Sequence, residues 1–203
     1  MGSALEIEVT CRLRRSWGTA GILPAGILAR AARHAARAEG FRGGQLSIVV
    51  VGAARMATLH ARYLHRDGPT DVLTFDLGTD RRQGRLEAEI IVCADAAISA
   101  ARAAPPRRGR AETSPAAGAR RVRAELALYV VHGVLHLAGY ADHAPADFRR
   151  MHAREDELLE QLGLGAVFAA GADPDVAGRG TPHRATPKRG RHRSRSRAAQ
   201  PAG

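Results

Sequence analysis

Two histidines that could bind a metal ion stand four residues apart, at His132 and His136, within an apolar segment. On a helix, residues at this spacing project from one face, so both imidazole rings could bind a single ion. Gly139 offers a helix stop, and Asp142 and His143 follow as ligand candidates on a turn that could fold back toward the same face. Such a pair could also be two packed core residues, but the additional candidates favour a metal site.

The chemistry of such a site is hydrolytic. A zinc ion with three protein ligands keeps one position for water and lowers the pKa of that water to about 7. Peptidases with two helical histidines usually carry a glutamate directly after the first, and here that residue is Gly133. The sequence therefore disfavours peptide hydrolysis. Phosphodiester cleavage is another reaction open to such a site, in which the metal ion neutralises phosphate charge.

The elements that must position these residues follow from hydrophobic periodicity and from helix end signals. Alternating or β-branched runs predict four strands, at 5–9, 45–51, 71–75 and 86–93. Helical spacing, Pro and Gly predict five helices, at 24–39, 53–64, 94–104, about 122–137, and 146–162. The fourth helix carries the histidine pair, and we expect it to pack inward through Leu126, Tyr129, Val130 and Val134.

The positive charge of the chain is concentrated in two stretches. The net charge is +11, but Val176–Gly203 holds eight Lys or Arg and no acids, and Arg102–Arg123 holds seven Arg and one Glu. The remainder carries about −3. We expect one folded domain at 1–165 with a mobile basic loop at 105–119, followed by a disordered basic tail at 166–203 that attracts phosphate groups.

Cysteine usage and hydropathy indicate the compartment. The two cysteines, Cys11 and Cys93, are far apart and form no Cys-x-x-Cys pattern, so neither a disulfide framework nor a thiolate zinc site is expected. No run approaches the roughly 20 apolar residues that span a bilayer, and the N-terminus lacks a signal peptide pattern. We therefore predict a cytoplasmic protein with no membrane partner.

Two segments of the chain resemble the signature motifs of a known family. They are Pro69–Phe75 (PTDVLTF) and His132–Tyr140 (HGVLHLAGY), and they are similar to motifs of the YbeY family of bacterial metal-dependent endoribonucleases. The similarity runs from about Leu46 to Gly163 and includes Met151 and Glu155. The resemblance implies a single α+β domain related to metalloproteases (zincin-like), with a mixed four-stranded sheet and about five helices.

The resemblance also implies a third metal ligand, at which this chain departs from the family. The family pattern ends Gly-Tyr-Asp-His, with that histidine as the ligand, whereas this chain has Gly-Tyr-Ala-Asp-His at 139–143. An ungapped comparison puts Asp142 in the ligand position and keeps Met151 at the family's distance from His132. An insertion would make His143 the ligand instead. We favour one Zn²⁺ ion bound by His132, His136 and Asp142, with His143 as the alternative.

A second departure concerns the residues that would act on substrate. The arginine of the family falls on Leu64, and Arg62 and Arg66 are the candidates to replace it, although both could be solvated helix-end residues. Asp71, next to Thr70, could orient the site or could serve as a structural turn residue.

Two functions remain open from the sequence. The resemblance implies a single-strand-specific endoribonuclease in 16S ribosomal RNA 3′-end processing and ribosome quality control, with ribosomal RNA and the small ribosomal subunit as partners and no DNA. The alternative is a non-catalytic, ribosome-associated RNA-binding factor with a structural metal. A structural zinc site is usually closed by four protein ligands, whereas a catalytic one keeps an open position.

Overall fold

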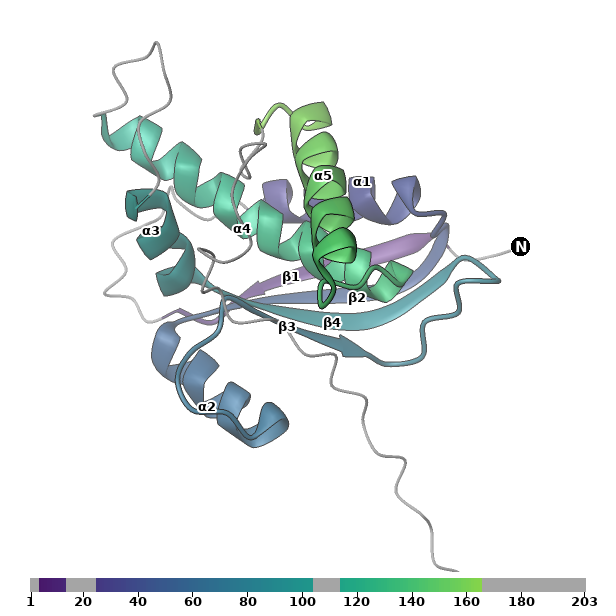
Figure 1. Ribbon diagram of the computed structural model, residues 1–203, viewed down its shortest axis with the longest axis horizontal. Coiled ribbons are helices and arrows are strands. Elements are labelled where there is room, and N and C mark those ends of the chain that lie inside the picture. The colour runs from purple at the N-terminus through teal and green to yellow at the C-terminus, as the bar shows by residue number, and fades with distance from the viewer. Residues whose placement is uncertain (1–3, 14–24, 104–113, 166–203) are drawn as a thin grey trace, which may run out of the picture.

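A mixed four-stranded sheet forms the centre of the protein (Figure 1). The computed structural model describes residues 4–13, 25–103 and 114–165. The strands are β1 (Leu5–Cys11), β2 (Gly43–Val51), β3 (Val72–Asp76) and β4 (Arg85–Cys93). The helices are α1 (Ala25–Ala38), α2 (Ala53–Leu64), α3 (Ala94–Ala103), α4 (Pro115–Ala138) and α5 (Pro145–Gln161). The predicted α+β class is confirmed.

The order of the strands across the sheet is β1-β2-β4-β3. β1 pairs with β2 in parallel, because α1 returns the chain to the same end of the sheet. β2 also pairs with β4 in parallel, and α2 and β3 lie between these two strands in the sequence. β3 joins β4 directly and pairs with it antiparallel, which makes β3 an edge strand. The segment that precedes β3, at 69–71, lines a pocket together with Tyr129 of the helix that carries the histidine pair.

The two faces of the sheet are covered unequally. Figure 1 shows α1, α4 and α5 on one face and α2 on the other. Residues of α1, α3, α4 and α5 share one large core with the inward side chains of the strands, such as Ile48 and Ile90. α2 makes a smaller second core through Met56 and Leu59. The helix that carries the histidines is thus packed on the main core, and its predicted inward face is buried.

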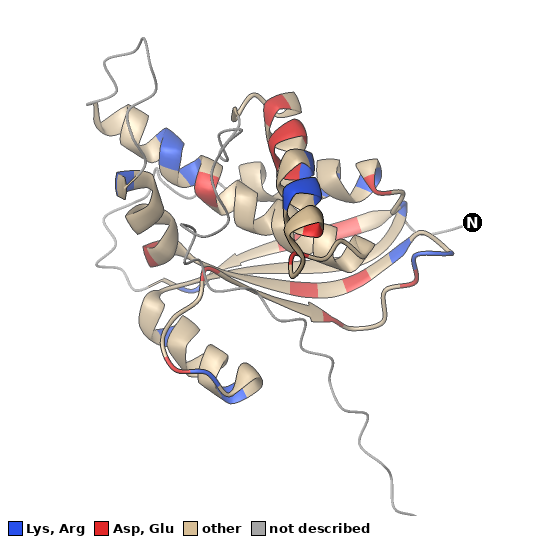
Figure 2. Cartoon of the chain, in the orientation of Figure 1, with Lys and Arg blue, Asp and Glu red and all other residues tan. Residues whose placement is uncertain are grey.

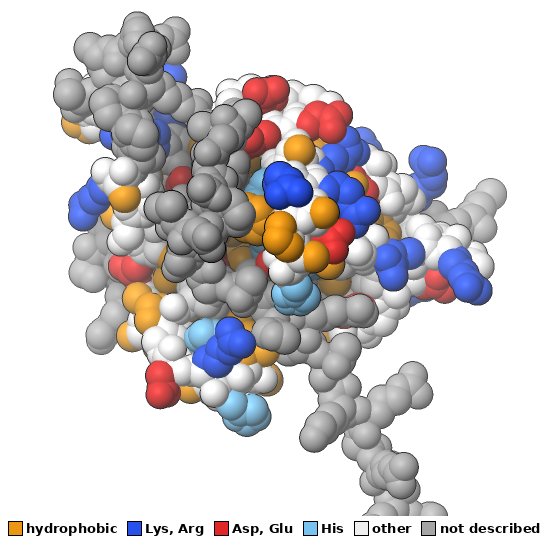
Figure 3. Space-filling model, viewed as in Figure 1, with side chains coloured by type: hydrophobic (Ala, Val, Ile, Leu, Met, Phe, Trp, Pro, Cys, Tyr) orange, Lys and Arg blue, Asp and Glu red, His pale blue; other side chains and the backbone are white. Residues whose placement is uncertain are grey.

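Acidic side chains occupy the part of the second face that α2 leaves uncovered. Glu6 and Glu87 lie in one row of the sheet, each opposite Gln45, and Glu8 and Glu89 lie in the next row, each opposite Ser47. Figure 2 shows these red segments along β1 and β4. Figure 3, from the same side, shows Lys and Arg over α5 and the β3–β4 hairpin, with Asp and Glu side chains also on α5. The part of the sheet that α2 leaves uncovered is therefore an acidic surface, whereas α5 carries charges of both signs.

The helix α4 begins about two turns earlier than the sequence predicted. Ser114 accepts a hydrogen bond from the Ala117 N–H through its side chain (3.2 Å), and Pro115 occupies the first turn. Residues 115–119 therefore belong to the helix and not to the predicted loop. The prediction failed because this Ala, Gly and Arg stretch has no apolar periodicity, although Ser-Pro is itself a helix-start signal. Residues 104–113 and the tail at 166–203 lie outside the described ranges.

Gly133 allows α4 to lie close to the sheet. A Cβ atom at this position would be 2.8 Å from both Ile90 Cδ1 and Thr74 Oγ1, nearer than side-chain carbons approach in real structures. The residue after the first histidine is therefore glycine for a packing reason. Because a glutamate side chain does not fit there either, the general base that peptidases carry at this position is excluded by the fold.

None of the helices in the described ranges has the length and the apolarity needed to span a lipid bilayer.

Candidate metal centre

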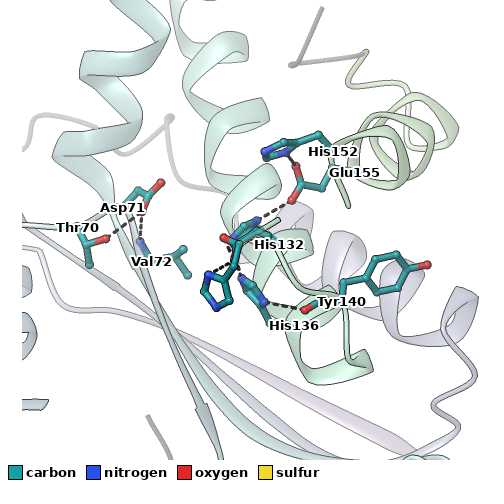
Figure 4. Close-up of polar contacts among 10 residues, drawn as sticks. Thr70, Asp71, Val72, His132, His136, Tyr140, His152 and Glu155 are labelled. Carbon is teal, nitrogen blue, oxygen red and sulfur yellow. Dashed lines mark hydrogen bonds and ion pairs between the residues drawn. The ribbon is translucent and has the colours of Figure 1, made fainter. Parts of the chain in front are cut away.

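The histidine pair lies on the last two turns of α4, with both rings facing each other (Figure 4). The Nε2 atoms of His132 and His136 are 3.0 Å apart, and the ring planes are nearly perpendicular at 89°. Two nitrogen ligands bound at about 2.0–2.1 Å to a tetrahedral ion lie about 3.3 Å apart. The predicted pair is therefore brought together at a spacing that fits one shared ion.

The partners of the two Nδ1 atoms decide which nitrogens carry hydrogen. His132 Nδ1 donates to Glu155 Oε1 at 2.6 Å, and His136 Nδ1 donates to the backbone carbonyl of Tyr140 at 3.1 Å. Both acceptors hold the hydrogen on Nδ1, so in the neutral rings both Nε2 atoms present lone pairs. Two lone pairs at 3.0 Å repel unless a cation lies between them, which is the chemistry of a metal-binding pair.

Asp142 offers a third candidate ligand atom. Its Oδ2 lies 3.8 Å from His136 Nε2, and one ligand atom from each of His132, His136 and Asp142 lies within 4.8 Å of the others. The residue is 7% exposed, and its buried Oδ1 accepts no hydrogen bond in the described structure, although His143 Nδ1 lies 3.4 Å from it. A buried carboxylate needs hydrogen-bond donors or a cation nearby. These three residues could hold a metal ion.

His143 lies differently from Asp142. Its side chain is 65% exposed, and its Nδ1 is 3.4 Å from Asp142 Oδ1. It does not belong to the group of three converging ligands found among the described residues. The geometry therefore favours the ungapped alternative over the one in which His143 binds the ion.

The electrostatics of the pair fit a single positive charge. Burial acts to lower the pKa of His132, but the hydrogen bond and the charge of Glu155 outweigh it and raise that pKa above its ordinary value. Burial, followed by the charge of His132, lowers the pKa of His136 to about 4. A proton on His132 therefore disfavours a second proton on His136.

Glu155 joins the metal centre to α5. The residue is fully buried, and its second oxygen, Oε2, accepts a hydrogen bond from His152 Nδ1 at 2.5 Å. Burial acts to raise the pKa of Glu155, but the hydrogen bonds from His132 and His152 hold that pKa below its ordinary value. Sequence reasoning named Glu155 only through the family resemblance and did not identify His152. The signal was present as a His-x-x-Glu spacing on one face of a predicted helix.

The turn after α4 is fixed by a glycine and an arginine. Gly139 has a φ of 97°, and its N–H caps the helix at the carbonyls of Leu135 and His136. Arg81, on the β3–β4 hairpin, donates to the Ala138 carbonyl at 2.9 Å. The φ of 97° favours glycine, and a Cβ at this position would also displace the Arg81 guanidinium from the Ala138 carbonyl. The turn that carries the Tyr140 carbonyl and leads to Asp142 is thereby held against the sheet.

The predicted substrate residues separate into two groups. Asp71 lies near the ligands, since its charge contributes to the raised pKa of His132, and it accepts hydrogen bonds from Thr70 Oγ1 (3.0 Å) and from the Val72 N–H (2.9 Å). Figure 4 shows Thr70 and Asp71 at the strand side of the site, apart from the histidines. These bonds show that the Asp71 side chain is a structural turn residue at the start of β3. Its predicted role in orienting the site stays a prediction.

Arg62 and Arg66 are exposed at the end of α2, and Leu64 packs against the smaller core. The Arg62 guanidinium lies 5.5 Å from the centroid of the Tyr63 ring. Within the described ranges, neither arginine makes a hydrogen bond or an ion pair with a residue of the metal centre. Both arginines are therefore surface cations. Their predicted contact with substrate stays a prediction.

A family model and curated relatives indicate one family. A family model described as "Endoribonuclease YbeY" matches residues 25–163, which include both sequence motifs. The Endoribonuclease YbeY of Anaeromyxobacter sp. (strain Fw109-5) is 37% identical over 149 residues, covering 73% of this chain and 70% of that protein. The Endoribonuclease YbeY of Chlorobium luteolum is 35% identical over 136 residues, covering 67% and 87%. A solution structure of a Thermotoga maritima protein aligns at 20% identity with a TM-score of 0.46, covering 82% and 99%.

Proposed function

Because this chain belongs to the YbeY family of endoribonucleases, we propose that it cleaves single-stranded RNA with one divalent metal ion during ribosomal RNA maturation in the cytoplasm. The proposed steps are 16S ribosomal RNA 3′-end processing and ribosome quality control at the small ribosomal subunit. The observation that supports a metal-dependent reaction is the convergence of two histidine Nε2 atoms and one buried carboxylate.

The ligand set we propose is His132, His136 and Asp142, and the ion we propose is Zn²⁺. Imidazole nitrogen and carboxylate oxygen are both accepted zinc ligands, and the carboxylate adds a negative charge that strengthens the hold on a divalent ion. When bound, the ion would supply Lewis-acid chemistry, neutralising phosphate charge and activating the attacking oxygen.

Several of the chain's own groups prepare the site for this role. The Tyr140 carbonyl and the Glu155 carboxylate keep hydrogen on the Nδ1 atoms of the two histidines, so that both Nε2 atoms are available. The Asp142 carboxylate is buried, and its Oδ1 accepts no hydrogen bond from the described residues. We propose that Asp71 orients the substrate or the attacking group at the start of β3.

A cation opposite the metal would stabilise the charge that develops on the phosphate. We propose that Arg66 or Arg62 serves this purpose in place of the arginine that Leu64 replaces. Figure 3 supports a cationic approach to this part of the surface, since histidine, Lys and Arg side chains lie over α2. In this proposal, one strand of RNA contacts both the metal centre and an arginine at the end of α2.

We propose that residues 1–165 form the catalytic domain and that 166–203 add a sequence-independent attraction to phosphate. The eight positive charges from Val176 to Gly203, without any acid, support this division.

The alternative function, a ribosome-associated factor with a structural metal, predicts a closed site. The three converging ligands and the outward-facing His143, whose side chain is 65% exposed, support an open position instead. Open coordination is a requirement for catalysis and serves no purpose in a purely structural site.

The test is cleavage of a single-stranded RNA oligonucleotide by the full chain, with and without a chelator, beside the His136→Ala variant. We expect the wild type to cleave, and the chelator to abolish cleavage until Zn²⁺ or another divalent ion is restored. His136→Ala should be inactive at every metal concentration that restores the wild type. Cleavage that persists in the variant at the wild-type rate would reject the proposed centre, and RNA binding without any cleavage would favour the alternative.

A further inference from the structure

We propose that His152 is a positioning residue of the metal centre, which acts on the ligand His132 through the carboxylate of Glu155. This inference rests on the proposed metal site. It adds to that site a residue on α5 that does not itself contact the ion.

The buried charge of Glu155 is balanced by two histidines. Its side chain is 0% exposed, Oε1 accepts from His132 Nδ1 at 2.6 Å, and Oε2 accepts from His152 Nδ1 at 2.5 Å. Each oxygen therefore accepts a hydrogen bond from one imidazole, and no Lys or Arg among the described residues forms an ion pair with either oxygen. Both donors together set the orientation of the carboxylate plane. Loss of the hydrogen bond from His152 therefore changes the hydrogen bond between Glu155 and His132.

His152 is held firmly in this arrangement. It lies one turn before Glu155 on α5, and its side chain is only 12% exposed. The Phe148 ring packs edge-on against it, with centroids 3.9 Å apart, and its own ring is nearly parallel to that of His132 at 6.5 Å and 19°. Figure 4 shows His152, Glu155 and His132 in sequence leading to the pair of Nε2 atoms. Two hydrogen bonds thus link His152 on α5 to the candidate ligand His132, and Phe148 packs against His152.

Loss of the His152 donor would leave a buried carboxylate oxygen without a partner. Such an oxygen is costly, and the carboxylate then turns to find another donor. This rotation weakens the hydrogen bond to His132 Nδ1, which keeps the ring oriented and its Nε2 lone pair available. The consequence at the metal centre is a weaker hold on the ion, without any change in the three ligands.

Two substitutions separate the hydrogen bond from the packing. His152→Leu keeps apolar contact with Phe148 but removes the donor, and His152→Asn keeps an N–H group near the position of Nδ1. Outer-shell partners of metal ligands are worth about 10–100-fold in affinity. We expect His152→Leu to weaken Zn²⁺ binding about tenfold, the low end of that range, and His152→Asn to restore most of it. His152→Ala serves as a second donor-free variant should leucine fit poorly.

A double-mutant cycle tests whether the effect passes through Glu155. In a Glu155→Gln background, we expect His152→Leu to change Zn²⁺ affinity by less than about twofold, because the carboxylate that transmits the effect is gone. A matched control is His34→Leu, since His34 Nε2 also bonds a residue of α5, Gln161, at 2.8 Å, but far along the helix from Glu155. It should leave Zn²⁺ affinity unchanged.

The measurement is competition of the full-length protein with a chromophoric chelator for Zn²⁺, together with the visible absorption spectrum of the Co²⁺-loaded protein. A positioning role predicts weaker binding and an altered Co²⁺ spectrum in His152→Leu, with recovery of both in His152→Asn. Unchanged affinity and spectrum in His152→Leu, in a wild type that binds Zn²⁺, would overturn this inference alone. Equal losses in the leucine and asparagine variants would also overturn it, because packing would then explain the effect. A wild type that binds no Zn²⁺ would overturn the metal centre itself.

Discussion

The close approach of α4 to the sheet at Gly133 leads to a prediction about stability. In Gly133→Ala, the new Cβ would lie 2.8 Å from Thr74 Oγ1 and from Ile90 Cδ1, where ordinary contacts are 3.4–4 Å. The helix or both neighbours must therefore move by about 0.6 Å, and overpacking of this kind costs about 1–3 kcal/mol. Alanine is also a better helix former than glycine by about 1 kcal/mol, which opposes that cost.

Gly118 provides the matched control on the same helix. A Cβ there meets nothing within 4 Å, so Gly118→Ala gains helix propensity without a packing cost. Comparing the two variants cancels the propensity gain, and we expect Gly133→Ala to be less stable than Gly118→Ala by about 1–3 kcal/mol. Urea unfolding of the metal-free proteins, followed by circular dichroism, measures this difference.

The same substitution should affect metal binding less than it affects stability. His132, His136 and Asp142 all belong to α4 or to the turn that follows it, so a small shift of the helix carries them together, whereas Asp71 on the sheet side stays behind. We expect Zn²⁺ affinity within about threefold of the wild type, and a larger loss of RNA cleavage. A Gly133→Ala protein as stable as Gly118→Ala would refute the account of why glycine stands there.

Three further outcomes are expected. Ser114→Ala removes the side-chain cap of α4 and should destabilise the protein by about 1 kcal/mol in urea unfolding, with RNA cleavage unchanged; an unaltered midpoint would contradict this. Gly139→Ala should lower both the thermal midpoint and Zn²⁺ affinity, because the new side chain meets φ 97° and the Arg81 guanidinium, which together hold the turn after α4; wild-type affinity would show that this turn does not position the ligands. Removal of residues 171–203 should leave the folding of the rest intact and weaken RNA binding at low salt, and the difference should shrink as salt rises; equal binding across a salt titration would exclude a role for the tail.

The strands and most helices could be predicted because their signals are local. Alternation in Leu5–Val9 and the β-branched run at Gln45–Val51 predict strands directly, and the structure extends these strands by two residues each. The early start of α4 was missed because Ala, Gly and Arg give no apolar period, and the helix there depends on its cap and on Ala117, which is buried. Hydrophobic periodicity predicts a helix that buries large apolar side chains, but it does not detect a helical turn that packs through small residues such as alanine.

The sequence predicts the candidate ligands of the site, which stay a prediction, but not the contacts that support them. His132 and His136 share one helix, so their spacing predicts their convergence, and the position of Asp142 followed from the spacing of a family motif. The contact between Glu155 and His132 joins two helices, and that between Arg81 and the carbonyl of Ala138 joins a hairpin to a helix. Such contacts depend on how the elements pack, which no local pattern reports.

The most direct test of the metal centre is the Zn²⁺ content of the purified full-length protein beside Asp142→Ala and His143→Ala, measured by mass spectrometry of the metal. We expect about one ion per wild-type chain, full content in His143→Ala, and loss of most of the metal in Asp142→Ala, since a zinc ion held by two histidines alone lacks its third ligand. Full metal content in Asp142→Ala together with loss in His143→Ala would contradict the assignment.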